Sequence, residues 1–241
     1  MLTLQPTDKI NEEALFSALT TIKPTAIRFR LDYTPEQAFS LLRTACRVEV
    51  QNRCRSFNET PQFRKHITDI ANWLTSPDNP SFGLFLCGGA GNGKTTVLRA
   101  LQSIVNFVKR DEPFSSREDS FPIKGFMFVS AKELVTLAKA YANPTRENEA
   151  DASRFRRLRN IEVLAIDDLG QEPKESIHYG EFLTPAIDII SSRYDEQLCT
   201  IISSNLTPSE IGSYYDERIA DRFREMMTII NFGNEKSFRK A

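Results

Sequence analysis

The sequence lacks several features that would fix its class by themselves. Its longest apolar runs are far shorter than the roughly 20 residues that a membrane-spanning helix needs, and its start, MLTLQPTDKI, has no basic segment followed by an apolar core. Its formal net charge at pH 7 is only −1, so any contact with nucleic acid must come from a local basic patch. We therefore expect a cytoplasmic protein with no membrane partner.

Cysteine, histidine and glycine are also scarce. The four cysteines and two histidines do not show the paired short spacing of a zinc site, and ten glycines among 241 residues do not suggest a fibrous or low-complexity chain. The sequence therefore indicates no structural metal, and a cytoplasmic location predicts reduced thiols. Its length suits one main globular domain with an appendage of about sixty residues.

The first part of the chain is expected to be helical and separate from the main domain. Residues 1–58 are polar, and the stretch 36–54 repeats apolar residues every three to four positions, which predicts a helix. A second helix is expected over 61–75, followed by a loop rich in proline and asparagine. We therefore expect a helical arm over 1–58 and the main domain over 59–241.

From residue 82 onward, short apolar runs alternate with amphipathic helices. This alternation is typical of a parallel sheet covered by helices on both faces. Strands are predicted over 82–87, 125–129, 162–166, 199–203 and 228–232, and helices over 94–110, 130–142, 149–159, 180–196 and 215–226. The predicted fold class is therefore α/β, with a central parallel five-stranded sheet and the architecture of a nucleotide-binding protein.

A phosphate-binding loop (P-loop, Walker A) follows the first of these strands. Its pattern G-x-x-x-x-G-K-[ST] precedes an amphipathic helix, as the chemistry requires, because glycines and a helix N-terminus direct backbone N–H groups at phosphate. Lys94 would reach the β- and γ-phosphates and the Thr95 hydroxyl would bind Mg²⁺. The alternative is a glycine-rich turn without a ligand. The predicted ATP-binding residues are Gly88, Gly89, Ala90, Gly91, Asn92, Gly93, Lys94, Thr95 and Thr96.

Two carboxylates end the predicted strand over 162–166, in the form of a Walker B element. Asp167 is expected to hold Mg²⁺ together with Thr95. Asp168 is then the candidate general base that polarises the attacking water. The alternative is a surface pair of aspartates at the junction of a strand and a loop.

Further candidates come later in the chain. Asn205 ends the strand over 199–203 and is expected to orient water or contact the γ-phosphate, although an asparagine there can also form a turn. Arg218 and Arg222 lie four residues apart on one helix face, which suits an arginine finger or a set of solvated salt bridges. Arg239 lies almost at the end of the sequence, where an arginine is ordinarily exposed to solvent.

The densest basic stretch is a candidate site for binding single-stranded nucleic acid. Its arginines can face outward along one helix and bind phosphates without reading sequence. A solvated charged helix face would explain the same pattern, and Lys132 and Lys139 are weaker candidates. The basic stretch contains Arg154, Arg156, Arg157 and Arg159.

The ordered set of motifs closely resembles the bacterial helicase loaders of the DnaC and DnaI type, which are AAA+ ATPases, and the related IstB transposition ATPases. The resemblance covers roughly residues 60–241 and rests on five segments: 88–95, 166–170, 203–207, 218–222 and 237–239. It implies that Asn205 is sensor 1, that Arg222 is a finger inserted into a neighbouring subunit's ATP, with Arg218 in support, and that Arg239 is sensor 2. Many members carry glutamate at the position of Asp168, and the end of the sequence leaves no room for a C-terminal helical lid.

The resemblance also implies partners and a function. Family members bind ATP between self-associated subunits on single-stranded DNA, and their N-terminal part, here the arm over 1–58, binds a hexameric replicative helicase of the DnaB type. We therefore expect a DNA-stimulated ATPase that loads a helicase during DNA replication. The alternatives are a helper ATPase for a transposase, a switch that binds ATP without hydrolysing it, and a small-molecule kinase, which the position of the arginines disfavours.

Overall fold

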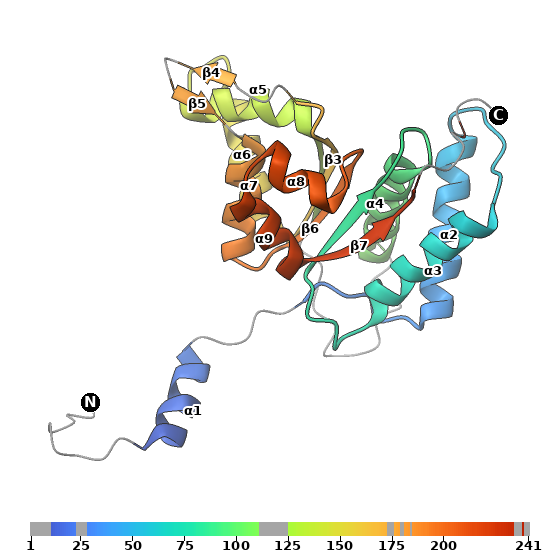
Figure 1. Ribbon diagram of the computed structural model, residues 1–241, viewed down its shortest axis with the longest axis horizontal. Coiled ribbons are helices and arrows are strands. Elements are labelled where there is room, and N and C mark those ends of the chain that lie inside the picture. Colours follow the sequence, from blue (N-terminus) through green and yellow to red (C-terminus); the bar gives the residue numbers. More distant parts are fainter. Residues whose placement is uncertain are drawn as a thin grey trace, which may run out of the picture.

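The computed structural model describes residues 11–22, 28–110, 125–172, 176–178, 181–183, 185–233 and 238. Figure 1 shows a sheet domain with helices on both faces and a helix, α1, that lies apart from it. Among the described residues, no helix combines the length and apolar character needed to cross a membrane. In chain order the elements are α1 (Glu12–Ile22), α2 (Pro35–Gln51), α3 (Pro61–Thr75), β1 (Gly83–Cys87), α4 (Lys94–Arg110), β2 (Phe126–Ser130), α5 (Ala131–Ala142), α6 (Glu149–Asn160), β3 (Val163–Leu169), β4 (Ser176–His178), β5 (Glu181–Leu183), α7 (Pro185–Asp195), β6 (Cys199–Ser204), α8 (Pro208–Tyr214), α9 (Glu217–Met226) and β7 (Met227–Asn231).

The central sheet confirms the predicted fold class. Its five strands run in the order β2-β3-β6-β1-β7, and every pair of neighbours is parallel. All five predicted strands are present, with ends shifted by at most three residues. Because β6 lies between β1 and β3, the P-loop strand and the acidic strand are separated by the strand that leads to Asn205.

The two faces of the sheet bury different side chains of the same strands. Along β1, Leu84 and Leu86 pack with α2, α3 and α4 on one face. Phe85 and Cys87 point the other way and pack with α5 to α9. Successive side chains in a strand alternate between faces, so a continuous apolar strand is what a sheet covered on both sides requires.

Two predicted helix starts are wrong by two or more residues. The helix predicted over 180–196 begins at Pro185, because Glu181–Leu183 form β5, which pairs antiparallel with β4. The helix predicted over 215–226 begins at Glu217, because the Asp216 side chain accepts a hydrogen bond from the N–H of Ile219 at 2.8 Å and caps it. Neither short element, β4 nor α8, was expected from the sequence.

The helix predicted over 36–54 is α2, and it packs directly on the sheet domain. Leu42 and Cys46 are fully buried in the same cluster as Leu84 and Leu86 of β1. The helix ends at Gln51, and Cys54, which follows it, has a positive φ of 55°. Apolar residues between Phe29 and Phe57 are therefore part of the hydrophobic core, while the assignment of 1–58 as a partner-binding arm stays a prediction.

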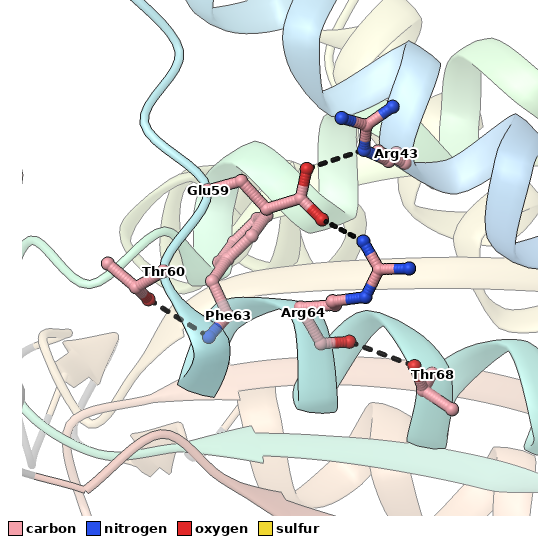
Figure 2. A network of polar contacts seen from close by, with 6 residues as sticks. All are labelled: Arg43, Glu59, Thr60, Phe63, Arg64 and Thr68. Carbon is pink, nitrogen blue, oxygen red and sulfur yellow. Dashed lines mark hydrogen bonds and ion pairs between the residues drawn. The ribbon is translucent and has the colours of Figure 1, made fainter.

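An ion-pair network holds α2 against the start of α3. Glu59 lies between the two helices and accepts from Arg43 of α2 at 2.5 Å and from Arg64 of α3 at 3.0 Å (Figure 2). The hydroxyl of Thr60 accepts a hydrogen bond from the N–H of Phe63 and caps α3. This network fixes the first turn of α3, and with it the buried ring of Phe63.

Candidate functional site

The P-loop lies between the end of β1 and the start of α4, where the sequence predicted it. Gly88 and Gly93 have φ angles of 129° and 100°, a region that side chains rarely adopt. A Cβ atom on Gly88 would also lie 2.8 Å from the carbonyl oxygen of Gly233. The glycines therefore allow a backbone turn that delivers N–H groups to the N-terminus of α4, which is a binding site for anions such as phosphate.

Residues from outside the motif support this loop. The N–H of Gly89 donates to the carbonyl of Gly233 at 2.8 Å, and the N–H of Phe238 donates to the carbonyl of Gly91 at 2.9 Å. The Phe63 ring lies under Gly93, 3.1 Å from where a Cβ would be, and packs edge-on against Phe238. Sequence reasoning missed all three supports: the parallel pairing of β7 with β1 brings Gly233 to the loop, and the packing of α3 brings Phe63.

Lys94 brings the P-loop and Asn205 together. Its side chain is buried, with 5% of the residue exposed. The ammonium donates to the carbonyls of Gly88 at 2.6 Å and Gly89 at 2.7 Å, and to the Oδ1 atoms of Asn92 and Asn205, each at 3.2 Å. A buried cation beside an anion-binding turn fits the phosphates of a nucleotide, and Asn205 lies within reach of the same ligand.

Thr95 and Asp167 meet at the start of α4, as predicted for a magnesium site. The Thr95 hydroxyl donates to Asp167 Oδ1 at 3.0 Å, and the Ser203 hydroxyl donates to the same oxygen at 2.5 Å. Asp167 is buried. A hydroxyl and a carboxylate beside a phosphate-binding turn are the hard oxygen ligands that Mg²⁺ prefers, so this set fits the ion, with Ser203 orienting the carboxylate.

Asp168 differs from Asp167 in exposure and in backbone conformation. It is exposed, its φ is +57°, and the pairing of β3 with β6 shifts register between Ile166 and Leu169. Its N–H donates to the hydroxyl of Ser203 at 3.0 Å. Backbone strain in a non-glycine residue is often found at functional sites, and here it turns Asp168 to the surface while Asp167 faces the loop. Ser203, which contacts both residues, is a site residue that the sequence did not reveal.

The two candidate finger arginines lie on α9 in different surroundings. Arg222 donates to the hydroxyl of Ser191 on α7, lies over the ring of Tyr194 at 5.3 Å and is 4.0 Å from Asp195. Arg218 is exposed in the first turn. Within the described part of the chain, the contacts of Arg222 lie on α7, away from the P-loop. Arg239 lies outside the described residues.

The arginines of α6 are largely engaged with neighbours. Arg154 pairs with Glu133 at 2.6 Å, Arg156 pairs with Glu149 at 2.9 Å, and Arg159 donates to the hydroxyl of Ser192 at 3.1 Å. Arg157 is exposed. Exposed ion pairs of this kind are weak, so they leave the prediction of a nucleic-acid contact open.

In the described part of the chain, the thiols show no metal site or disulfide. All four cysteines are free, and within the described ranges no group of three or more His, Cys, Asp or Glu side chains is placed to hold a metal ion. Burial raises the pKa of the Cys46 and Cys199 thiols to about 12, while Cys54 is exposed.

Comparisons with known proteins find partial sequence matches and a shared fold. No protein-family model matches the chain. Over 140 residues, 58% of the chain, it is 27% identical to the chromosomal replication initiator protein DnaA of Thermoanaerobacter sp. (strain X514), and it matches DnaA of Lactococcus lactis subsp. cremoris (strain MG1363) equally well. The matched segment spans only about a quarter of those proteins, 27% and 26% of their lengths.

Two solved structures share the fold over most of their length. The crystal structure of DnaI superposes with a TM-score of 0.52 and 21% identity, over 78% of this chain and 93% of that one. The crystal structure of the DnaC helicase loader superposes with a TM-score of 0.51 and 19% identity, over 73% of this chain and 92% of that one. The resemblance predicted from the motifs is therefore confirmed in the fold: this chain shares the α/β fold of the DnaI and DnaC structures.

Proposed function

We propose that this protein is a Mg²⁺-dependent ATPase that works as an assembly and loads a replicative helicase of the DnaB type onto single-stranded DNA. The observation that carries the proposal is the meeting of Lys94, Thr95, Asp167 and Asn205 around one glycine-rich turn. A turn that only connects β1 to α4 would not need a buried cation and a buried carboxylate beside it. The shared fold with DnaI and DnaC supports the choice of helicase loading within this class.

Each residue has a proposed role in hydrolysis. The loop from Gly88 to Thr96 binds the phosphates, with Lys94 balancing their charge, and Thr95 and Asp167 hold Mg²⁺, which would neutralise charge that develops on the phosphate oxygens. Asp168 accepts a proton from the attacking water and Asn205 orients that water. Because aspartate is one methylene shorter than the glutamate common at this position, we expect hydrolysis to be slow.

The second half of the site is proposed to come from a neighbouring subunit. Arg222, supported by Arg218, would stabilise negative charge on the γ-phosphate across the subunit interface, as arginine fingers do. The contacts of Arg222 with α7, rather than with the P-loop of its own chain, support this arrangement. Arg239 is proposed as sensor 2. The arginines of α6 are proposed to contact the phosphates of single-stranded DNA, and the arm over 1–58 to bind the helicase.

The first experiment measures steady-state ATP hydrolysis against protein concentration, with and without single-stranded DNA. We expect a rate per subunit that rises with concentration and with DNA. Lys94→Ala and Arg222→Ala should each abolish it, while Lys65→Ala and Arg224→Ala, on exposed faces of α3 and α9, should not. If Arg222→Ala stays active and the rate per subunit ignores concentration, the site works alone and a small-molecule kinase becomes the better interpretation.

A second experiment separates the possible partners. Copurification with a hexameric helicase, lost when residues 1–27 are removed, supports loading, because this deletion leaves the core residues from Phe29 onward in place. Stimulation of strand transfer by a transposase, with no helicase bound, would instead indicate an IstB-like helper ATPase. Asp168→Asn tests turnover itself, because an unchanged rate would contradict the proposed base and favour a switch that binds ATP without hydrolysing it.

A further inference from the structure

A buried carboxylate lies just beyond the acidic pair and is not used by the proposed hydrolysis. Glu172 is only 6% exposed, although it follows β3 in a loop. Its Oε2 accepts the N–H of Gly170 at 2.8 Å, and the N–H of Gln171 donates to the carbonyl of Asp168 at 3.1 Å. Residues 168–172, which we name the acidic loop, are thus held in one tight turn that ends on this carboxylate. Burial of a carboxylate is costly unless it is well hydrogen-bonded.

The other oxygen of Glu172 reaches a different element. Its Oε1 accepts the phenol of Tyr215, and the phenol of Tyr214 donates to the Glu172 carbonyl at 3.4 Å. Burial, together with the negative charge of Glu172, raises the pKa of Tyr215, so this phenol stays a hydrogen-bond donor. The bond joins the acidic loop to the junction between α8 and α9.

Tyr215 lies at a point that determines where α9 begins. It is the C-cap of α8, with its N–H donating to the carbonyl of Ile211 at 2.9 Å, and Asp216 is the N-cap of α9. Arg218 follows three residues after Tyr215, in the first turn, and Arg222 follows one turn later. Anchoring Tyr215 therefore places the first turn of the helix that carries both arginines.

The same loop is also tied to the nucleotide-binding turn. Asp168 donates its N–H to Ser203, whose hydroxyl donates to Asp167, which in turn accepts from Thr95 of the P-loop. Gly170, with φ of 91°, leaves no room for a side chain, since a Cβ would lie 2.7 Å from Leu206. A continuous set of contacts thus runs from Thr95 through the acidic loop and Glu172 to Tyr215.

We propose that Glu172 is a positioning residue that couples the two halves of each shared site: it ties the acidic loop, next to a subunit's own nucleotide, to the start of α9, which presents Arg218 and Arg222 to the next subunit. The inference rests on the proposed function, because it requires sites shared between subunits. Breaking the Glu172–Tyr215 bond should misplace the arginines that a subunit presents to its neighbour. It should leave the subunit's own ATP-binding site unchanged.

A mixture of two defective variants tests this coupling. The lender, Lys94→Ala, has no working site but carries both arginines; the acceptor, Arg218→Ala with Arg222→Ala, has an intact site but no arginines. Mixing them should restore hydrolysis where an acceptor site faces a lender's α9. If this unmodified mixture stays inactive, the sites are not shared, and both the proposed function and the coupling are overturned.

Tyr215→Phe is then placed in one partner at a time, because it removes the phenol and keeps the ring. In the lender it should lower the restored rate about tenfold, the loss expected for one hydrogen bond to a charged acceptor. In the acceptor it should leave the rate within about twofold, which is within the scatter of independent sites. Equal losses in the two placements, or no loss in either, would overturn the coupling while the shared site stands.

Two further variants test whether the loss comes from the Glu172–Tyr215 bond itself. Tyr141→Phe in the lender is the matched control, because this ring packs on Phe155 of α6 at 5.1 Å and its phenol has no part in the loop; it should change nothing. Glu172→Gln keeps the shape of the side chain and should also act in the lender. An amide has one acceptor oxygen for the two donors, Gly170 and Tyr215, so Glu172→Gln weakens the link. With Tyr215→Phe already present, its effect in the lender should be smaller than its effect alone; fully additive losses would contradict the proposed bond.

Discussion

Two buried cations lie at opposite ends of the central sheet, and only one of them marks a candidate site. Lys94 lies at the carboxyl ends of the strands, beside the P-loop, and is 5% exposed. Arg193 of α7 lies near the amino ends of β3 and β6 and is 0% exposed. Burial alone does not distinguish them, so the difference must lie in what each one contacts.

Arg193 is enclosed by acceptors that belong to the fold. Its guanidinium donates to the carbonyls of Leu158 at 3.0 Å, Ile161 at 2.7 Å and Cys199 at 2.6 Å, and to the hydroxyl of Thr200 at 2.9 Å. Burial lowers its pKa to about 10, so it keeps its charge at neutral pH. These acceptors join the end of α6, the start of β3 and the start of β6, and the arginine is a structural clamp.

Lys94 is held differently. It has a single compact ammonium group, and its acceptors are two carbonyls of a glycine-rich turn and two amide side chains, Asn92 and Asn205. The turn also delivers N–H groups at the start of α4, so an anion can bind beside the ammonium without any strand moving. A buried cation therefore indicates a ligand only where anion-binding backbone accompanies it.

The largest expected effect is on ATP hydrolysis, which should depend on Lys94. Lys94→Ala should lower the rate of ATP hydrolysis by at least about a thousandfold, because it removes a charge placed at the phosphates. Its thermal unfolding midpoint should stay close to that of the wild type. A Lys94→Ala protein that unfolds, and whose folded fraction still binds nucleotide as the wild type does, would contradict this prediction. Lys94 would then be a structural clamp, like Arg193.

The next effect is on stability. Arg193→Met keeps much of the side-chain volume but leaves several buried carbonyls without a donor, and should lower the free energy of unfolding by about 3 kcal/mol. Urea unfolding followed by circular dichroism measures this loss. Arg224→Met, on the exposed face of α9, is the matched control and should change stability by less than about 0.5 kcal/mol. A stable Arg193→Met would show that water satisfies these carbonyls.

A smaller effect is expected at Ser203, which contacts both aspartates. Ser203→Ala removes the donor to Asp167 and the acceptor for the N–H of Asp168, and should lower the hydrolysis rate about tenfold through misplaced carboxylates. The Mg²⁺ concentration needed for half-maximal rate should rise as well. Ser209→Ala, on exposed α8, is the control. An unchanged Mg²⁺ requirement would remove Ser203 from the proposed metal site.

The smallest effect uses a thiol beside the structural clamp. Burial raises the pKa of Cys199 to about 12 from an ordinary value of 9.0, with Arg193 acting in the opposite direction. The folded state therefore keeps the Cys199 thiol neutral. The contribution of this thiol to the free energy of unfolding is fully present below pH 9 and is lost as the pH rises toward 12. Between pH 8 and 10, Cys199→Ala should lose about 1 kcal/mol less stability than the wild type; equal losses would contradict the raised pKa.

Sequence predicted the parts of the fold and site that depend on neighbouring residues. The P-loop pattern, the five apolar strands and the aspartates at 167 and 168 each carry their signal within a few positions, because glycine conformation, strand burial and helix N-termini are local properties. The predicted start at residue 180 was wrong for α7 because a short hairpin, β4 with β5, replaces its first residues.

What the sequence determined by itself is therefore the order of the motifs and the class of ligand they suit. Only the tertiary structure decided which distant residues complete them: Ser203 between the aspartates, Gly233 and Phe238 against the P-loop, and Tyr215 on Glu172. The reason is the sheet order, in which β6 and β7 flank β1. Such strand neighbours are set by long-range packing, and a single sequence leaves no local trace of them.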